Sequence, residues 1–336
     1  RLAAEHQVAL PFTYYPGQFL TIAVPIDGKT ARRSYTIASS PTQLHYASIT
    51  VKREDHGAVS RYLHDEIKVG DTLEVAAPNG KFTFTGAESE SIVLIAGGVG
   101  VTPMMSAIRY LTDIGWSKDI YLLFSCRTTS DFMFREELEQ LQARNPNLNV
   151  FASMTRAEGA VWMGLKGRFT REIIQHLVPE VESRRVHVCG PPPMMTAVLD
   201  MLTEIGVPKS MVHTEAFGPA SRPVRPVVQP IVVGEPPTLE ARSDVAAKSD
   251  VSRVAFKRSG KEGALREGMT VLDLADEIGV DIDNSCRTGQ CGLCKVQLIS
   301  GHVTMEADDA LSDEDKSSNI ILACQATAIE PIEVDV

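Results

Sequence analysis

The sequence predicts a multidomain protein in which an antiparallel β-barrel, a doubly wound α/β layer and a small C-terminal module follow one another. Three observations support this prediction. Short β-like runs fill the first part, strands alternating with amphipathic helices fill the middle, and four of the six cysteines lie near the C-terminus. The length of 336 residues and the hydrophobic content of 43% are enough for two or three separate cores.

The barrel is predicted for residues 1–88, where Gly, Pro and Asn-Gly turns separate short β-like runs. Several short strands with turn signals between them are typical of a small antiparallel barrel. The runs lie at residues 19–24, 34–37, 47–52 and 72–75.

The α/β layer is predicted for residues 89–218, where apolar strands alternate with amphipathic helices. SIVLIA precedes a helix expected from Pro103, DIYLLFSC precedes a helix with Phe134, Leu138 and Leu141 on one face, and RRVHVCG precedes a helix with Met195, Val198, Leu199 and Leu202 together. Apolar strands of this kind are buried on both faces, so the pattern predicts a Rossmann-like, doubly wound parallel sheet.

Residues 219–250 form a proline-rich segment with little periodicity, which predicts a partly extended, semi-rigid linker. Beyond it, residues 251–336 carry 8 Lys and Arg against 16 Asp and Glu, which is −8 of the chain's net −10. An acidic chain argues against nucleic acid as a partner. Acidity gathered in one module suits electrostatic steering onto a basic protein partner, and a merely solvating surface is the alternative.

The acidic module contains a cysteine run with the spacing C-x4-C-x2-C-x29-C, formed by Cys286, Cys291, Cys294 and Cys324. This is the plant-type spacing of [2Fe–2S] ligands. A structural zinc site usually uses two short knuckles, whereas only Cys291 and Cys294 form one here. The two other cysteines lie in apolar strands, which disfavours disulfides and indicates a reducing compartment, so we expect a cytoplasmic location.

Two stretches of the predicted barrel indicate a flavin site. RSYT, residues 33–36, lies on a predicted strand whose alternation places Arg33 and Tyr35 on one face. A guanidinium suits a pyrophosphate, a phenol ring can stack on an isoalloxazine, and the Thr36 hydroxyl can hydrogen-bond flavin N5. HGAVSRYL, residues 56–63, predicts a turn into a short helix whose N-terminus can hold phosphate.

Two glycine-containing turns indicate a nicotinamide dinucleotide site. GGVGVTP, residues 97–103, directly follows SIVLIA, and CGPPPMM, residues 189–195, ends a later strand. Glycines allow close approach of a cofactor, and Pro103 suits the first position of a helix. Both turns are expected at the carboxyl edge of the sheet, where ligands bind.

Taken in order, R-x-Y-[ST], G-x-G-x-T-P and C-G-P-P-P-M resemble the ferredoxin–NADP⁺ reductase superfamily. NSCRTGQCGLCKVQLISG followed by ILACQA resembles a plant-type ferredoxin with the β-grasp fold. The whole chain is therefore similar to oxygenase reductases of the phthalate dioxygenase reductase type. This resemblance implies a flavin-binding barrel at 1–88, an NAD(P)-binding domain at 89–218, the linker at 219–250 and a [2Fe–2S] domain at 251–336.

The resemblance also implies site residues. The flavin set is Arg33, Ser34, Tyr35, Thr36, Thr50, Val51, Lys52, Gly57, Val59 and Ser60. The nucleotide set is Gly98, Gly100, Thr102, Pro103, Arg127, Cys189 and Gly190. The residues expected to line the hydride-transfer site are Thr36, Cys189, Glu215 and Phe217, and Phe217 is the aromatic that covers the flavin. No side chain is expected to act as a nucleophile, because the protein's part in such catalysis is positioning and potential tuning.

The longer HGAVSRYL element favours FAD over FMN, although FMN remains an alternative. Arg127 and Arg135 follow the second strand of the α/β layer, where a 2′-phosphate would lie. Similar arginines occur in relatives that use NADH, so NADH is the expected reductant and NADPH the alternative.

The expected function is electron transfer from NAD(P)H through flavin and cluster to a Rieske, P450 or diiron oxygenase. One alternative is the reductase of a hybrid-cluster protein. Another is the reductase tail of a larger fused protein, because the chain starts at Arg1 in a strand-like segment without an initiator Met. No apolar run approaches the roughly 20 residues of a membrane span.

Overall fold

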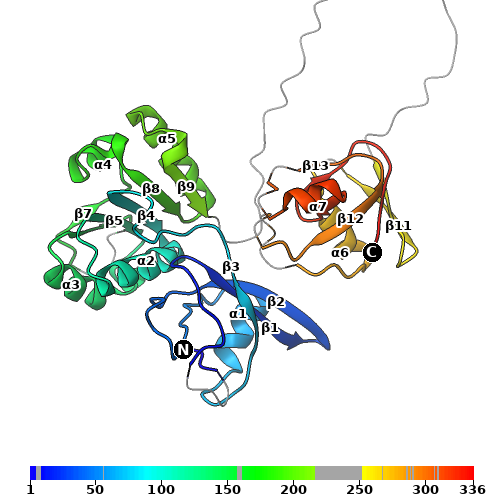
Figure 1. Cartoon of the computed structure of the whole chain (residues 1–336), viewed down its shortest axis with the longest axis horizontal. Helices are drawn as coiled ribbons and strands as arrows, with labels where there is room; N and C mark the ends of the chain where they lie inside the picture. The colour runs from blue at the N-terminus through cyan, green and yellow to red at the C-terminus, as the bar shows by residue number, and fades with distance from the viewer. Residues whose placement is uncertain are drawn as a thin grey trace, which may run out of the picture. The chain divides into compact units, whose positions relative to one another are not determined.

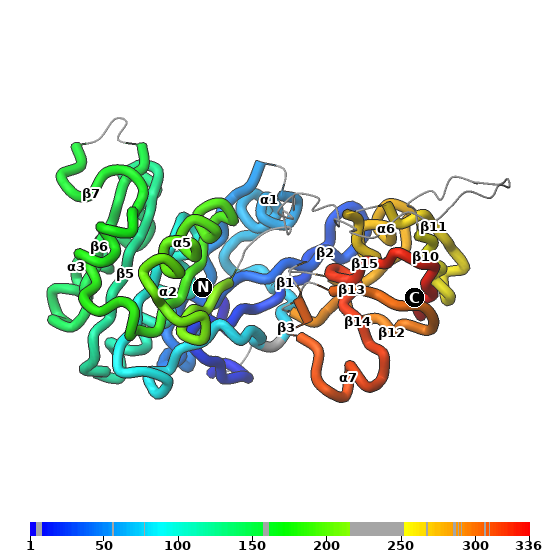
Figure 2. Tube along the Cα trace, turned by 90° about the horizontal axis from the view of Figure 1, so that it is seen from above, coloured from blue at the N-terminus to red at the C-terminus, as the bar shows by residue number. Residues whose placement is uncertain are grey.

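The computed structural model divides into two compact units, Arg1–Gly218 and Pro219–Val336, called the front unit and the C-terminal unit (Figures 1 and 2). It describes residues 1–4, 9–55, 57–156, 161–215, 252–266, 268–284, 287, 289, 291–305, 307–308 and 310–336. The predicted linker at 219–250 and the predicted site residues Phe217 and Cys286 lie outside the described residues.

The front unit begins with an antiparallel sheet in the strand order β2-β1-β3. Its elements are β1 (Phe19–Ile26), β2 (Lys29–Thr36), β3 (Glu74–Asn79) and the helix α1 (Ala58–Asp65). Asp27 and Gly28 both have positive φ, 51° and 76°, as a two-residue hairpin turn between β1 and β2 requires. α1 contributes Val59 to a core with Ile22 and Val24 of β1.

The strand predicted at residues 47–52 is not formed as a regular strand. Ala47 and Ile49 each make only an isolated β-bridge. Beyond them the chain is fixed to α1, because the Val51 carbonyl oxygen accepts a hydrogen bond from Nε2 of His64 at 2.8 Å. Residues 47–52 therefore make isolated bridges and single hydrogen bonds in place of a continuous ladder.

The rest of the front unit is a parallel sheet in the order β7-β6-β5-β4-β8-β9, with helices on both faces (Figure 1). The strands are β4 (Ser91–Gly97), β5 (Asp119–Cys126), β6 (Leu148–Met154), β7 (Leu165–Lys166), β8 (Arg185–Cys189) and β9 (Val212–Glu215). The helices are α2 (Val101–Asp113), α3 (Arg135–Arg144), α4 (Arg171–Leu177) and α5 (Pro192–Ile205). The predicted doubly wound sheet is confirmed, and the helix expected from Pro103 begins two residues earlier.

Alternate residues of β4 enter two different cores. Leu94 packs with Met105 of α2 in one cluster, and Val93 and Ile95 pack with Val198 of α5 in the other. Both faces are thus buried, which explains why SIVLIA is a continuous apolar run instead of an alternating one. Each such side chain contributes roughly 1.5–3 kcal/mol on burial.

Helix α2 joins the parallel sheet to the antiparallel sheet. The Ser106 hydroxyl donates to the Ser39 carbonyl oxygen at 2.9 Å, and the Arg109 guanidinium donates to the carbonyl oxygen of Ala38. Arg109 is itself held by Glu137 of α3 at 2.6 Å. The residues that follow β2 are therefore fixed against helix α2 of the parallel layer.

The two tryptophans of the front unit pack against loops and hydrogen-bond to them. The indole Nε1 of Trp116 donates to the Gly86 carbonyl oxygen at 3.2 Å, and its ring meets Phe84 edge-on at 5.6 Å. Trp162 donates to the Leu165 carbonyl oxygen at 2.7 Å. Both are packing residues, as their positions in the sequence predicted.

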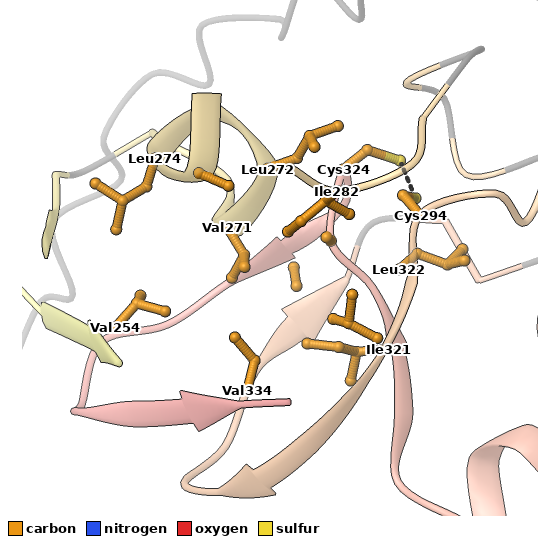
Figure 3. Packing of buried hydrophobic residues seen from close by; sticks show 14 of the residues in the cluster. Val254, Val271, Leu272, Leu274, Ile282, Cys294, Ile321, Leu322, Cys324 and Val334 are labelled. Atoms are coloured by element: carbon orange, nitrogen blue, oxygen red, sulfur yellow. Dashed lines mark hydrogen bonds between the residues drawn. The ribbon is translucent and has the colours of Figure 1, made fainter. Parts of the chain in front are cut away.

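The C-terminal unit is a mixed sheet in the order β11-β10-β16-β12-β14 with the helix α6 packed on it. Its main elements are β10 (Ser252–Phe256), β11 (Lys261–Leu265), α6 (Val271–Ile278), β12 (Lys295–Ser300), α7 (Asp313–Ser317), β14 (Ile320–Leu322) and β16 (Ile332–Val334), and a small ladder joins β13 (Thr304–Met305) to β15 (Ala326–Thr327). Figure 3 shows its core, in which Val254, Leu272 and Val334 pack together beside Cys294 and Cys324. This is the β-grasp arrangement that the resemblance implied.

In the described part of the chain, no helix combines the length and the apolar character that crossing a membrane requires.

Candidate functional site

The RSYT stretch lies at the end of β2. Arg33 and Tyr35 lie two residues apart on the strand and so share one face. Burial raises the pKa of the Tyr35 phenol, and the nearby positive charge of Arg33 partly offsets this effect. Ser34 points to the opposite face, where its hydroxyl lies 2.9 Å from the hydroxyl of Thr21. The strand therefore presents an aromatic ring and a guanidinium side by side, as a flavin nucleotide site needs.

Thr36 supports this assignment from its own environment. Its Oγ1 is buried and has no hydrogen-bond partner among the described residues. Buried hydroxyls are normally hydrogen-bonded, so an orphaned one suggests a partner that is itself a bound group. The residues present thus fit a flavin beside the end of β2.

At the predicted phosphate turn, residues 57–60, the side chains hydrogen-bond and pack within the protein itself. The Ser60 hydroxyl donates to the Gly57 carbonyl oxygen at 3.0 Å and accepts from the Glu54 backbone N–H at 3.2 Å. Val59 is buried in the barrel core. Gly57 is the N-cap of α1, so any phosphate contact here would use backbone N–H groups. Of the remaining predicted flavin residues, Thr50 and Val51 are half-buried and Lys52 is exposed and pairs with Glu54.

The two glycine turns meet where the strand order of the parallel sheet reverses. β4 and β8 are adjacent, with Ala96 opposite Cys189, so both turns emerge side by side at the carboxyl edge. A Cβ added to Gly100 would lie 2.2 Å from the Cys189 carbonyl oxygen. Gly98 has a φ of 53° and nothing within 4 Å of an added Cβ, so open space lies beside it. Ligands of doubly wound sheets bind at this kind of switch point.

The other predicted residues of these turns build the turn itself. The Thr102 hydroxyl donates to the Val99 carbonyl oxygen at 2.8 Å, and Pro103 is buried in the first turn of α2. The thioether of Met194 lies over Gly190 and Gly97, 2.9 Å and 2.2 Å from the Cβ that each lacks. Sequence reasoning did not identify Met194 as part of this site.

Cys189 and Glu215 form a buried pair on β8 and β9, directly opposite in the sheet register. Burial raises the pKa of the Cys189 thiol well above its usual value, and the charge of Glu215 raises it further. The thiol is therefore neutral and is not an activated nucleophile. This fits the expectation that the residues around the nicotinamide position it and take no covalent part.

Two residues earlier on the same two strands, β8 and β9, lies a pair of histidines whose proximity the sequence did not reveal. His187 and His213 are also opposite one another, with ring centroids 5.0 Å apart. His187 is buried and accepts from Arg185 Nε at 3.1 Å. Burial lowers the pKa of His187 well below its usual value, and the charges of Arg185 and His213 lower it further.

Three of the four predicted cluster cysteines are described, and all three are buried. The sulfurs of Cys294 and Cys324 lie 3.2 Å apart (Figure 3). This separation is too long for a disulfide and is close to the ~3.8 Å expected of two thiolates on one tetrahedral metal ion. The hydrogen bond to Cys324 raises the pKa of Cys294, followed by burial, and Cys291 adds a smaller electrostatic contribution. Among the described residues no group of three or more metal-ligating side chains assembles, and Cys286 lies outside them.

The cluster loop is tied down by residues outside the cysteine motif. Arg287 has a φ of 53°, and its guanidinium reaches Asp276 of α6 at 2.5 Å. The Gln325 amide donates to the Arg287 carbonyl oxygen at 3.2 Å. Gly289 has a φ of 80°, and an added Cβ would lie 3.0 Å from the Ala307 carbonyl oxygen. These contacts hold the described residues of the loop, Arg287 and Gly289, close to Gln325 beside Cys324, and with the buried thiols they fit an iron–sulfur cluster.

Three family models match the chain in the predicted order. They are an oxidoreductase FAD-binding domain over residues 2–84, an oxidoreductase NAD-binding domain over residues 94–200 and a 2Fe-2S iron-sulfur cluster binding domain over residues 256–328. The glycine betaine monooxygenase reductase subunit of Chromohalobacter salexigens is 35% identical over 96% of this chain and 88% of its own length. The chain belongs to the reductase components of oxygenases.

Other proteins that are similar to this reductase are also oxygenase reductases. The ferredoxin reductase component of 3-ketosteroid-9-alpha-monooxygenase from Rhodococcus rhodochrous is 32% identical over 95% of this chain and 86% of its own length. The solved structure of phthalate dioxygenase reductase aligns with a TM-score of 0.59 and 26% identity, and it covers 98% of this chain and 89% of that one. The reductase is an NAD(P)H-dependent oxidoreductase with FAD, NAD and [2Fe–2S] domains.

Proposed function

We propose that this reductase passes electrons from NAD(P)H through FAD and a [2Fe–2S] cluster to a separate oxygenase. The observation that carries the proposal is that one chain holds two kinds of site. The front unit has adjoining glycine turns and a β2 strand with an orphaned Thr36 hydroxyl, and the C-terminal unit has the Cys294–Cys324 thiol pair. A bound flavin can exchange electrons in pairs with a nicotinamide and singly with a cluster. This property explains why one chain carries a flavin site, a nucleotide site and a cluster site.

We assign roles to the chain's own residues as follows. Arg33 meets the flavin pyrophosphate, Tyr35 stacks on the ring system and Thr36 hydrogen-bonds it. Gly98 and Gly100 let the nucleotide approach the N-terminus of α2, and Cys189 with Glu215 shapes the nicotinamide pocket. These assignments are best supported by the shared face of β2 and by the close packing of the two turns.

We assign Cys286, Cys291, Cys294 and Cys324 as cluster ligands. The thiols lose their protons on binding iron, because a coordinating metal outweighs the burial that raises the pKa of Cys294. The domain bounds 1–88, 89–218, 219–250 and 251–336 belong to the same proposal and agree in order with the matched family models.

The proposed acceptor is the monooxygenase component of a two-component system. The relatives named above are reductase subunits of monooxygenases, which favours an oxygenase over a hybrid-cluster protein. The acidic C-terminal unit suits a basic docking surface on that partner. We place the reaction in the cytoplasm, because cluster thiolates and nucleotide reductants both belong to a reducing compartment.

The test is an anaerobic titration of the purified reductase with NADH and with NADPH, in which flavin and cluster absorption bands are followed separately. Bleaching of both chromophores by a small excess of one nucleotide is the expected result, because FAD takes two electrons, the cluster takes one and each nucleotide supplies two. If flavin does not copurify, or if the cluster bleaches only with dithionite, the front unit is not an electron donor to the cluster and the proposal fails.

A further inference from the structure

Arg109 lies in α2, where the parallel layer meets the segment that follows β2 (Figure 1). Its helix begins at the nucleotide turn, and Arg109 follows about 12 Å farther along the helix axis. Its side chain is only 19% exposed. A charged group is thus partly buried at the junction between the two layers of the front unit.

The guanidinium of Arg109 joins three segments of the chain, namely its own helix α2, the residues after β2, and α3. Nε and Nη2 donate to the two carboxylate oxygens of Glu137 at 2.7 and 2.6 Å. Nη1 donates to the Ala38 carbonyl oxygen, and Cζ lies 5.0 Å from the centroid of the Phe134 ring. A planar group that is bound at its edges and on one face has a fixed orientation, so these contacts fix the segments that supply them.

Each of these segments carries part of the expected cofactor site. Ala38 follows Thr36, whose buried hydroxyl is expected to meet the flavin. Helix α2 starts directly after Gly100 of the nucleotide turn, and α3 follows β5 and the expected nucleotide residue Arg127. A displacement of Arg109 would therefore move the flavin side and the nucleotide side relative to each other.

Two further hydrogen bonds join α2 to the segment after β2. The Ser106 hydroxyl donates to the Ser39 carbonyl oxygen at 2.9 Å, and the Thr42 hydroxyl donates to Asp113 at 2.5 Å. A single hydrogen bond sets one distance, whereas the fork of Arg109 also sets a direction. Arg109 is thus the contact best suited to fix the angle between the layers.

A contribution to rate explains the Arg109–Glu137 ion pair better than a contribution to stability. A partly buried ion pair adds little net stability, because lost hydration offsets much of the attraction. Hydride transfer depends steeply on the approach of the reacting atoms, and a displacement of about 1 Å can slow such a step about 100-fold. A residue that fixes orientation at this junction is therefore expected to affect the rate of the step.

We propose that Arg109 is a positioning residue that sets the approach of the nicotinamide to the flavin, and that Glu137 and Phe134 hold it in place. The proposal rests on the proposed function, since it concerns hydride transfer in the same site. That step breaks a C–H bond of the nicotinamide and forms an N–H bond on the flavin, and both electrons of the hydride move to the flavin.

The test compares Arg109→Ala with the matched control Arg184→Ala in the full, flavin-loaded chain. Arg184 makes the same three kinds of contact. It pairs with Asp119 at 3.3 Å and donates to the Pro179 carbonyl oxygen at 2.7 Å, and its Cζ lies 5.0 Å from the centroid of the Tyr121 ring. These partners all belong to the parallel layer, and Arg184 directly precedes β8, at the edge of the sheet opposite the glycine turns.

Two measurements do not depend on turnover. Urea titrations should give similar losses of stability for the two variants, because similar contacts are removed. Hydrogen–deuterium exchange at the Ile37 and Ala38 amides, which are hydrogen-bonded within the barrel, should become several-fold faster in Arg109→Ala and stay unchanged in Arg184→Ala.

The third measurement is anaerobic stopped-flow reduction of the flavin by NADH and by NADPH. In Arg109→Ala we expect the limiting rate to fall about tenfold while the nucleotide dissociation constant changes less than about twofold, because the groups that bind the nucleotide remain. A deuterium isotope effect with nucleotide labelled at C4 identifies hydride transfer as the step observed. Arg184→Ala should keep the limiting rate of the unaltered chain.

Arg109→Lys and Glu137→Gln test the same proposal if Arg109→Ala does not fold. Lysine keeps the charge without the planar fork, and glutamine keeps an acceptor without the charge, so each should lower the limiting rate several-fold. Equal limiting rates per bound flavin in the Arg109 and Arg184 variants would overturn the proposal. So would weaker nucleotide binding at an unchanged limiting rate, because Arg109 would then act on affinity. Failure of the proposed function is seen earlier, in an unaltered chain whose flavin neither nucleotide reduces.

Discussion

The nucleotide turn and the cluster loop both depend on glycine, but the fold holds them in different ways. At the nucleotide turn, Gly100 lies against the backbone of the neighbouring strand, so that a Cβ would come within 2.2 Å of a carbonyl oxygen. In the cluster loop the nearest atoms to an added Cβ at Gly289 are 3.0 Å away, and the loop is tied by the side chains of Arg287 and Gln325.

This difference teaches that strand packing in the parallel sheet forms the nucleotide turn, whereas side-chain contacts and bound metal form the cluster loop. β4 and β8 must be adjacent for the front unit to fold at all, so the nucleotide turn is present before any ligand arrives. In the described part of the cluster loop, side chains such as Arg287 and Gln325 hold the chain near the thiols, and binding of metal contributes further to the folding of that loop. The two sites should therefore fail separately.

The largest difference between the two sites is expected for Cys324→Ala, which should disable the cluster and leave the flavin site intact. Removing one thiol of the 3.2 Å pair should abolish the cluster absorption bands and lower electron transfer to cytochrome c by about 100-fold or more. Reduction of the flavin by nucleotide should persist, because its residues lie in the other unit. Stopped-flow absorption measures both. The control is Cys126→Ala, a buried thiol in the parallel sheet whose pKa burial raises to about 12, and it should keep the cluster bands.

The second prediction compares two glycines of one turn. Gly100→Ala should destabilise the front unit by about 1–3 kcal/mol, because the backbone of Cys189 must move, and it should weaken nucleotide binding as well. Gly98→Ala meets only the strain of its φ of 53°, about 1 kcal/mol, but its methyl group points into open space where the nucleotide is expected. Urea titration by circular dichroism and the KM of each variant separate the two effects. Equal loss of stability in both would contradict a turn formed by strand packing.

The third prediction concerns the tie on the cluster loop. Arg287→Ala should remove the contact with Asp276 and leave the loop less ordered, so that a chelator bleaches the cluster several-fold faster, as loss of about 1 kcal/mol implies. Arg258→Ala, which breaks an exposed pair with Asp335 in the same unit, is the matched control. Identical bleaching rates for the two variants would mean that the Arg287 tie does not hold the cluster.

The smallest effect is a pH dependence confined to the front unit. Because burial holds the pKa of His187 well below 6.5, the unfolded chain binds more protons than the folded chain as pH falls below 6.5. Stability should therefore decrease by about 1 kcal/mol between pH 7.0 and 5.5 from this residue alone. The half-buried His213, whose pKa burial also lowers, adds a change of the same sign. His187→Phe should show a shallower slope in urea titrations at the two pH values, and an unchanged slope would assign the acid sensitivity elsewhere.

Much of the architecture could be predicted from the sequence because its signals are local. β4 and β5 contain continuous apolar runs, and the turns that follow β4 and β8 carry glycines. The strand expected at residues 47–52 was wrong as a regular strand, since Ala47 and Ile49 make only isolated bridges and the Val51 carbonyl oxygen accepts from His64. Short strands such as β7, with two residues, have no periodicity to detect.

The site residues that sequence reasoning missed depend on chain segments far apart in the sequence. His187 and His213 meet only through the register of β8 and β9. Arg287 lies inside the cysteine motif, yet its role depends on where α6 places Asp276. In each case the residue type was visible in the sequence, and the partner was not.

The packing of Trp116 against Gly86 and Phe84 allows the front unit to be followed by its fluorescence. Both tryptophans and all seven tyrosines of the chain lie in the front unit, and the C-terminal unit has none. Near-ultraviolet emission therefore comes from the front unit alone, while the visible charge-transfer bands of an iron–sulfur cluster belong to the C-terminal unit. Because the indole of Trp116 is held by Gly86 and Phe84, its emission should shift to the red when this packing is lost. The melting of each unit can thus be followed separately, in one sample and without an added label.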